Sequence, residues 1–184
     1  MAVAVVNYPT LRKEDLEWIQ SIRRKNDPLY YTLIQPHFAV VFPTEKMSEG
    51  MMIEHVKRKI AGVAPFEVVF RCVLLGDPSF QGHAHAYLVP DEGFSGLVRL
   101  HDLLYTGPLA GELRLDLPFI PHVAVANAPK PEDCKVIVDV INSKPFELQG
   151  RVETLDVIGY DGERVWTVER MGLGDPSDVQ EIIK

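Results

Sequence analysis

The chain has 184 residues, of which 46% are hydrophobic and 24% are charged, so it is long enough to bury a core and has the composition of a globular protein. Its formal net charge of −7 argues against binding of long duplex nucleic acid, although it is compatible with a nucleic-acid end or a small nucleotide. No run reaches the roughly 18 apolar residues of a membrane span, and the N-terminus lacks the basic segment of a secretory signal, so we expect a cytoplasmic protein with no membrane partner.

The first half of the chain predicts alternating strands and helices. Thr10 is a plausible cap for the first helix, whose apolar face contains Leu16, Ile19 and Ile22, while charged residues such as Arg23 lie largely off that face. In chain order we expect a strand at 2–6, a helix at 11–25, a strand at 35–42, a helix at 49–61, and strands at 66–75 and 83–89, the last two forming a hairpin.

The second half predicts a similar series. Asp161-Gly162 is a typical two-residue hairpin turn, and it separates the last two strands. A cluster of β-branched residues makes a strand the rival of the helix at 131–142. In chain order we expect a helix at 94–105, a strand at 119–126, a helix at 131–142, strands at 146–159 and 163–170, and a peripheral polar tail at 172–184.

Two pentapeptides in the chain are nearly identical. Residues 36–40 are Pro-His-Phe-Ala-Val, and residues 121–125 are Pro-His-Val-Ala-Val. Each copy lies in an apolar run that predicts a strand, where alternate side chains share a face, so each histidine should point the same way as the alanine two residues later. The repeat therefore predicts a duplicated fold in which the two imidazoles face each other across one cleft.

This pattern resembles the two-histidine phosphoesterase superfamily, in particular its 2′-5′ RNA ligase and cyclic phosphodiesterase-like proteins. The resemblance is carried by His37 and His122, which lie 85 residues apart, by the proline before each, by the helix and hairpin after each, and by Leu100-His101 ahead of the second strand. It covers most of residues 1–170.

The resemblance implies an α+β, bilobal duplicated fold with two antiparallel sheets around a central cleft and helices on the outside. It places a single domain at residues 1–171, with repeats at about 1–92 and 93–171. It also implies a monomeric enzyme with no metal and no cofactor, which acts on a 2′,3′-cyclic phosphate or a 2′-5′ phosphodiester of a nucleotide or RNA end. In this interpretation His37 and His122 are the catalytic residues.

Two histidines suit that chemistry. Cleavage of a cyclic phosphodiester needs a base for the proton of the attacking water or hydroxyl and an acid for the leaving oxygen. An imidazole pKa near 6.5 lets one ring be neutral while the other is charged at neutral pH. Which nucleophile enters the cleft decides between hydrolysis and ligation, and the sequence leaves both open.

The sequence departs from the family pattern at the hydroxyl that follows each histidine. Family members have Thr or Ser two residues after each histidine, where Ala39 and Ala124 stand here. Alanine cannot donate a hydrogen bond to phosphate, and loss of one such donor typically costs about 10² to 10³ in rate. The side chains that could replace these donors, which the sequence alone does not position, are Tyr30, Tyr31, Arg71, Arg99, Arg114 and Lys130.

Alternative functions remain open at this stage. The alanines also fit a non-catalytic module that binds a nucleotide or phosphate and has lost turnover. His83 and His85 share one face of a predicted strand and could contribute to a metal-dependent hydrolase, although no third ligand has a telling spacing. Lys57-Arg58-Lys59 fits either a solvated helix face or an RNA-guiding patch.

The remaining histidines and the cysteines have simpler interpretations. His55 and His101 are expected to be surface or packing residues. Cys72 and Cys134 are expected to be reduced structural thiols rather than a disulfide or a metal site.

Overall fold

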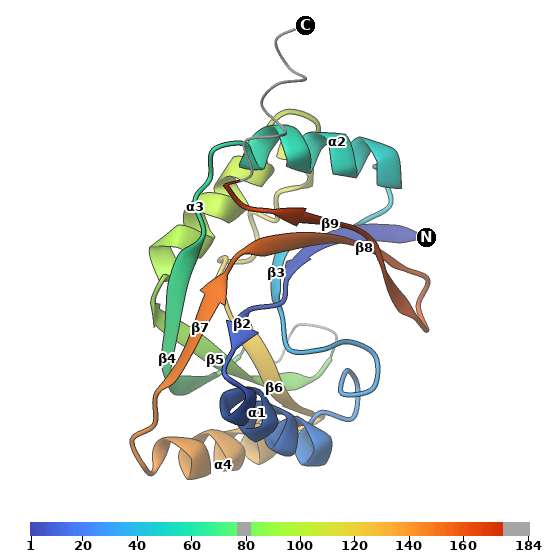
Figure 1. Cartoon of the computed structure of the whole chain (residues 1–184). Helices are drawn as coiled ribbons and strands as arrows, with labels where there is room; N and C mark the ends of the chain where they lie inside the picture. The colour runs from blue at the N-terminus through green and yellow to red at the C-terminus, as the bar shows by residue number, and fades with distance from the viewer. Residues whose placement is uncertain (77–81, 175–184) are drawn as a thin grey trace, which may run out of the picture.

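The computed structural model describes residues 1–76 and 82–174 (Figure 1). Most predicted elements are present within one or two residues of their expected bounds. The strands are β1 (Ala2–Asn7), β2 (Thr10–Leu11), β3 (Phe38–Thr44), β4 (Phe66–Leu75), β5 (Ala84–Glu92), β6 (Val123–Ala128), β7 (Leu148–Val152), β8 (Thr154–Tyr160) and β9 (Val165–Gly172). The helices are α1 (Lys13–Asn26), α2 (Glu49–Ile60), α3 (Phe94–Leu104) and α4 (Pro131–Asn142), with a 3₁₀ segment η1 at Gly107–Glu112.

The strands form two antiparallel sheets, as predicted. One has four strands in the order β3-β1-β8-β9, and the other has five in the order β2-β7-β4-β5-β6. Each sheet takes strands from both halves of the chain, because β8 and β9 extend the sheet of β1 and β3 while β7 joins that of β4. The fold is therefore α+β with two antiparallel sheets, and the division into repeats at about 1–92 and 93–171 stays a prediction.

Several expectations about element boundaries are wrong. The strands expected at 35–42 and 119–126 begin only at Phe38 and Val123, directly after the two histidines. The strand expected at 146–159 is two strands, because the chain crosses from the five-stranded to the four-stranded sheet at Glu153: Val152 pairs with Phe66, whereas Thr154 pairs with Gly172. Thr10 does not cap α1. It lies in β2 and pairs with Arg151 of β7, and Arg12 occupies the N-cap position without a capping hydrogen bond from its side chain.

The segment at 131–142 is a helix, so its strand alternative is wrong. Pro131 occupies the first turn, where its missing N–H costs no intrahelical bond, and Glu132 and Asp133 follow with charges that suit a helix N-terminus. Val136 and Val140 lie on the exposed face. These two β-branched residues therefore belong neither to a strand nor to the core.

One hydrophobic core joins the two sheets. Phe38 of β3 stacks on Phe70 of β4 with ring centroids 5.7 Å apart, and the buried residues around them come from both sheets. In Figure 1, α1 and α4 lie at one end of the molecule, next to the five-stranded sheet, and α2 lies at the other end, against β8 and β9. None of the helices in residues 1–76 and 82–174 has the length and apolar character needed to cross a membrane.

Candidate active site

His37 and His122 lie at equivalent places, one residue before the strands β3 and β6 begin. The residue after each, Phe38 or Val123, is buried in the core. Alternation along the strand then puts each histidine on the opposite, partly exposed face, together with the alanine two residues later. The local geometry of the two pentapeptides is thus the same.

Both imidazoles are held by the same kind of hydrogen bond. Nδ1 of His37 donates to the carbonyl oxygen of Gln35 at 2.8 Å, and Nδ1 of His122 donates to the carbonyl oxygen of Ile120 at 2.6 Å. A carbonyl only accepts, so these bonds place the ring proton on Nδ1 in the neutral form. Nε2 of each ring then has its lone pair available, and no described side chain or backbone group bonds to it.

The two rings share one electrostatic environment. Burial lowers the pKa of His37 to about 4. The charge of Arg23 lowers this pKa further, whereas the hydrogen bond to Gln35 raises it by less than burial lowers it. Burial also lowers the pKa of His122 to about 4, and the charges of His37 and His85 contribute. The charge of His37 acts on His122, so the two imidazoles are electrostatically coupled. Both rings are neutral at pH 7 in the free protein.

These pKa values predict an acid-sensitive fold. In the unfolded chain each histidine titrates near 6.5, so between about pH 6.5 and pH 4 the unfolded state binds protons that the folded state does not. The free energy of unfolding should therefore fall with decreasing pH in this window by at most about 1.4 kcal/mol per pH unit for each histidine. Urea denaturation at pH 7, 6 and 5 measures the slope. The double variant His37→Gln/His122→Gln should have a shallower slope, and an equal slope would contradict the assignment.

An aromatic row leads away from His122 on the five-stranded sheet. Tyr87 of β5 stacks on the His122 ring with centroids 3.6 Å apart and planes inclined by 26°. His85 follows at 5.7 Å from Tyr87, and Tyr30 at 6.2 Å from His85. This row was not predicted as a unit, because the sequence does not reveal that β5 pairs with β6.

Tyr8 lies beside the other histidine. Its ring centroid is 6.1 Å from that of His37. Burial raises the pKa of Tyr8 to about 12, and the charge of Asp156 adds to the increase. The phenol therefore keeps its proton at all physiological pH values and is a hydrogen-bond donor next to His37.

An ion pair with a buried carboxylate and an exposed guanidinium lies on the same sheet face as Ala39. The strand register aligns Ala39 with Val6, Val6 with Asp156, and Asp156 with Arg170, and residues opposite each other on antiparallel strands point to the same face. Asp156 is fully buried and accepts bonds of 2.9 Å from Nε and from Nη2 of Arg170, whose side chain is 60% exposed. Sequence analysis missed both residues. The available signal was the aspartate inside the apolar run at 155–158.

The six predicted phosphate-binding side chains are scattered. Only Tyr30 is brought into the aromatic row of His122. Arg71 is bound by Asp91, Glu92 and Glu147, Arg114 is bound by Asp116, Tyr31 accepts from Arg24, and Lys130 precedes α4 beyond the far end of β6. Arg99 lines a separate hollow of about 470 Å³ between α3 and residues 63–66, which contains neither His37 nor His122.

Three other histidines are buried in the protein, and for His55 and His101 this fits the packing alternative of the two predicted interpretations. His55 and His101 are buried, and their rings bond the carbonyl oxygens of Leu104 and Val40 at 2.8 and 2.9 Å. His85 is buried within the aromatic row. Within residues 1–76 and 82–174, no group of three or more His, Cys, Asp or Glu side chains could hold a metal ion.

Two further sequence features have simple environments in the structure. Both cysteines are free thiols, and Cys134 donates to the carbonyl oxygen of Ala84. In the basic run of α2, Lys57 lies 3.8 Å from Glu169. Neither feature contributes to the surroundings of the two histidines.

Comparisons with known proteins agree with this geometry. A model of the 2′-5′ RNA ligase superfamily matches residues 11–164. E. coli LigT complexed with 3′-AMP superposes with a TM-score of 0.66 at 15% identity, covering 95% of this chain and 98% of that chain. Usb1 of Kluyveromyces marxianus superposes with a TM-score of 0.51 at 12% identity, covering 91% and 97%.

The structural matches show the fold, and the family match spans most of the sequence. No curated protein matches the sequence significantly. The resemblance inferred from the repeated histidines is confirmed by the family match. The chain belongs to the 2′-5′ RNA ligase superfamily, a superfamily of two-histidine phosphoesterases.

Proposed function

We propose that this protein is a metal-independent phosphoesterase that acts on a 2′,3′-cyclic phosphate or a 2′-5′ phosphodiester of a nucleotide or RNA end. The observation that carries the proposal is the matched pair of imidazoles, His37 and His122, each bound through Nδ1 to a backbone carbonyl and each with Nε2 available. Two such nitrogens near one another are what acid–base cleavage of a phosphodiester requires.

In the hydrolysis of a 2′,3′-cyclic phosphate, water attacks phosphorus and one ribose oxygen leaves. Nε2 of one neutral histidine takes the proton of the water, and Nε2–H of the other, protonated histidine donates to the leaving oxygen. Because both rings are neutral at pH 7, the second ring must gain its proton as substrate binds. The negative phosphate favours this uptake, since an adjacent opposite charge stabilises the imidazolium.

A nucleotide is the ligand class that the relatives favour. E. coli LigT has been crystallised with 3′-AMP, with ATP, with NADP⁺ and with phosphate. The net charge of −7 favours such a small ligand or a nucleic-acid end over long duplex nucleic acid. The proposal also includes that the protein is a monomer, that it lies in the cytoplasm and that it needs no cofactor.

Restoring the two missing hydroxyls should increase activity. The double variant Ala39→Thr/Ala124→Thr adds one donor beside each imidazole, and one such donor is typically worth about 10² to 10³ in kcat, so a gain of at least about 10-fold is expected. The variant Ala39→Val/Ala124→Val is the matched control, because it adds the same volume without a hydroxyl. Equal rates for the Thr and Val variants would contradict a hydroxyl deficit and favour other donors, such as the phenol of Tyr8.

The experiment that tests the proposed function is turnover of 2′,3′-cyclic nucleotides by the purified protein in the presence of a chelator. Activity that resists the chelator and is lost in His37→Ala/His122→Ala supports the proposal. A rate no higher than that of the double variant contradicts it and favours the binding module, for which Ala39 and Ala124 are the supporting observation. Activity that is lost when the chelator is added favours the metal-dependent alternative.

A further inference from the structure

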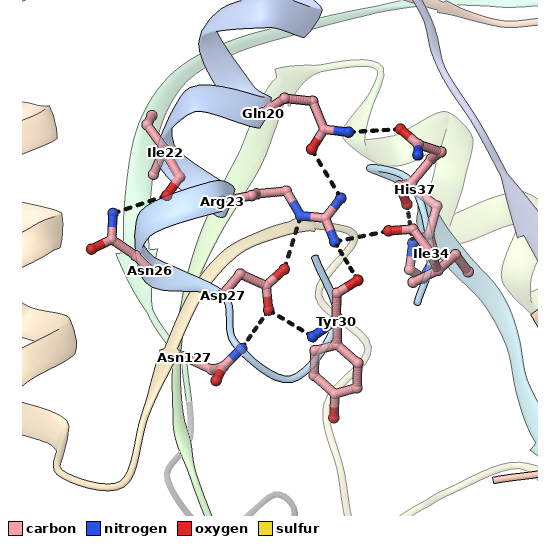
Figure 2. Close-up of polar contacts among 10 residues, drawn as sticks. Gln20, Ile22, Arg23, Asn26, Asp27, Tyr30, Ile34, His37 and Asn127 are labelled. Carbon is pink, nitrogen blue, oxygen red and sulfur yellow. Dashed lines mark hydrogen bonds and ion pairs between the residues drawn. The ribbon is translucent and has the colours of Figure 1, made fainter. Parts of the chain in front are cut away.

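A buried ion pair lies next to the segment that leads to His37 (Figure 2). Arg23 of α1 and Asp27, which follows the helix, are 2% and 1% exposed, and Nε of Arg23 lies 2.8 Å from Oδ2 of Asp27. Removing two charges from water is costly unless the remaining donors and acceptors are also bonded. The rest of this guanidinium and carboxylate should therefore have partners, and those partners show what the pair holds.

The guanidinium holds the segment at 28–36, which leads to His37. Nη2 of Arg23 donates to the carbonyl oxygens of Tyr30 at 3.0 Å and of Ile34 at 2.9 Å. Nη1 donates at 3.3 Å to Oε1 of Gln20.

Gln20 continues these contacts to the histidine itself. Its Nε2 donates to Oε1 of Gln35 at 2.6 Å, and the carbonyl oxygen of Gln35 is the acceptor for Nδ1 of His37. A chain of hydrogen bonds thus runs from Arg23 through Gln20 to Gln35, the residue whose backbone carbonyl fixes the His37 ring (Figure 2).

The carboxylate reaches the strand of the other histidine. Oδ1 of Asp27 accepts from the backbone N–H of Tyr30 at 3.2 Å and from Nδ2 of Asn127. Asn127 is 4% exposed and belongs to β6, five residues after His122. One carboxylate therefore joins the loop of His37, which enters the four-stranded sheet, to the strand of His122, which belongs to the five-stranded sheet.

We propose that Arg23, Asp27 and Asn127 are positioning residues that fix the placement of His37 relative to His122. In-line cleavage uses both imidazoles on opposite sides of one phosphorus, so the spacing between two separate sheets must be held within a fraction of an ångström. A misplacement of about 1 Å at a reacting group can cost about 10²-fold in rate. The expected effect on the reaction rate rests on the proposed function, whereas the expected effect on the placement of the two rings does not.

Asn127→Ala is the variant that separates positioning from folding, because it removes the link between the two sheets and keeps the ion pair intact. We expect kcat for a 2′,3′-cyclic nucleotide to fall by about 10- to 100-fold with KM changed less than about three-fold. The control is Asn142→Ala, which removes another side-chain amide that ties a helix to the five-stranded sheet, through bonds of 2.8 and 2.9 Å to Val73. Asn142 lies on α4, away from both histidines, and its variant should keep kcat within about two-fold.

A kcat for Asn127→Ala equal to that of Asn142→Ala, at equal folded fraction, would overturn the proposal. A second readout needs no turnover: the imidazole Cε1–H resonances of His37 and His122, followed by NMR against pH in both variants. Asn127→Ala should move both resonances and raise the pKa of His37 toward 6.5, because a looser loop admits water. If the wild type shows no turnover but these changes occur, the proposed function fails and the positioning role stands. Unchanged resonances and pKa overturn the positioning role whatever the activity.

Discussion

Replacing either His37 or His122 by alanine is expected to lower the rate of 2′,3′-cyclic nucleotide opening by about 10² to 10⁴-fold. Each variant removes the Nε2 that would accept or donate a proton, and it leaves Tyr8 and Tyr87, the aromatic neighbours of the two rings, in place. The loss should therefore appear mainly in kcat. Initial rates over a range of substrate concentrations separate kcat from KM.

The double variant provides a further test of the shared site. If the two rings act on the same phosphate, His37→Ala/His122→Ala should be little worse than the more damaging single variant, because residues that act as one unit are not additive. His83→Ala is the matched control, since His83 belongs to the metal-dependent alternative and should leave kcat within about two-fold. A severe loss in His83→Ala together with a mild one in His122→Ala would reverse the assignment.

Removal of Asp27 should produce the largest loss of stability. Asp27→Ala leaves the guanidinium of Arg23 buried without its counter-charge, and it also leaves the N–H of Tyr30 and the amide of Asn127 without their acceptor. Removing one partner of a buried pair typically costs about 3 to 5 kcal/mol. The midpoint of urea denaturation should shift accordingly, with the slope unchanged.

A surface pair with the same spacing provides the control. Lys135 and Asp139 also lie four residues apart at a helix, but their side chains are 53% and 62% exposed. Exposed pairs of this kind contribute about 0 to 1 kcal/mol, so Asp139→Ala should shift the midpoint far less than Asp27→Ala. Equal shifts would mean that the Arg23–Asp27 pair contributes no more than a surface contact.

Arg23 also shows where reading the helix from sequence fails. Helical periodicity places it off the apolar face of α1, yet it is 2% exposed. Periodicity assigns charged residues to solvent, and it cannot account for a guanidinium whose charge and donors are met by Asp27, Gln20 and two backbone carbonyls. Asp27 and the two carbonyls belong to the loop that follows the helix, which has no regular pattern.

The fold was more predictable than the surroundings of the site. The apolar runs of β1, β3, β6 and β8 and the apolar faces of the helices were sufficient to predict most elements, whereas the two antiparallel sheets were predicted from the family resemblance. The crossing between sheets at Glu153 was not predicted, because no Gly, Pro or Asn at 152–154 marks a turn there. The connection of the hairpin predicted from the strands at 66–75 and 83–89 includes residues 77–81, and the predicted tail includes residues 175–184; both ranges lie outside the described residues.

For the proposed site, the repeated pentapeptide is the sequence signal that indicates His37 and His122. The groups near them were not predictable, since Tyr8 and Tyr87 come next to the histidines only in the tertiary structure. Tyr87 is aligned with Ala124 by the β5–β6 register, and Arg170 with Ala39 by three successive strand pairs. Such alignments between residues far apart in sequence follow from tertiary structure alone.

The most direct test of the central claim, that His37 and His122 face one phosphate, is an NMR titration of both imidazoles with inorganic phosphate in the presence of a chelator. A shared site predicts that phosphate shifts both Cε1–H resonances with a single dissociation constant and raises the pKa of each ring above its value of about 4. A response from only one ring, or from neither, would contradict the shared two-histidine site.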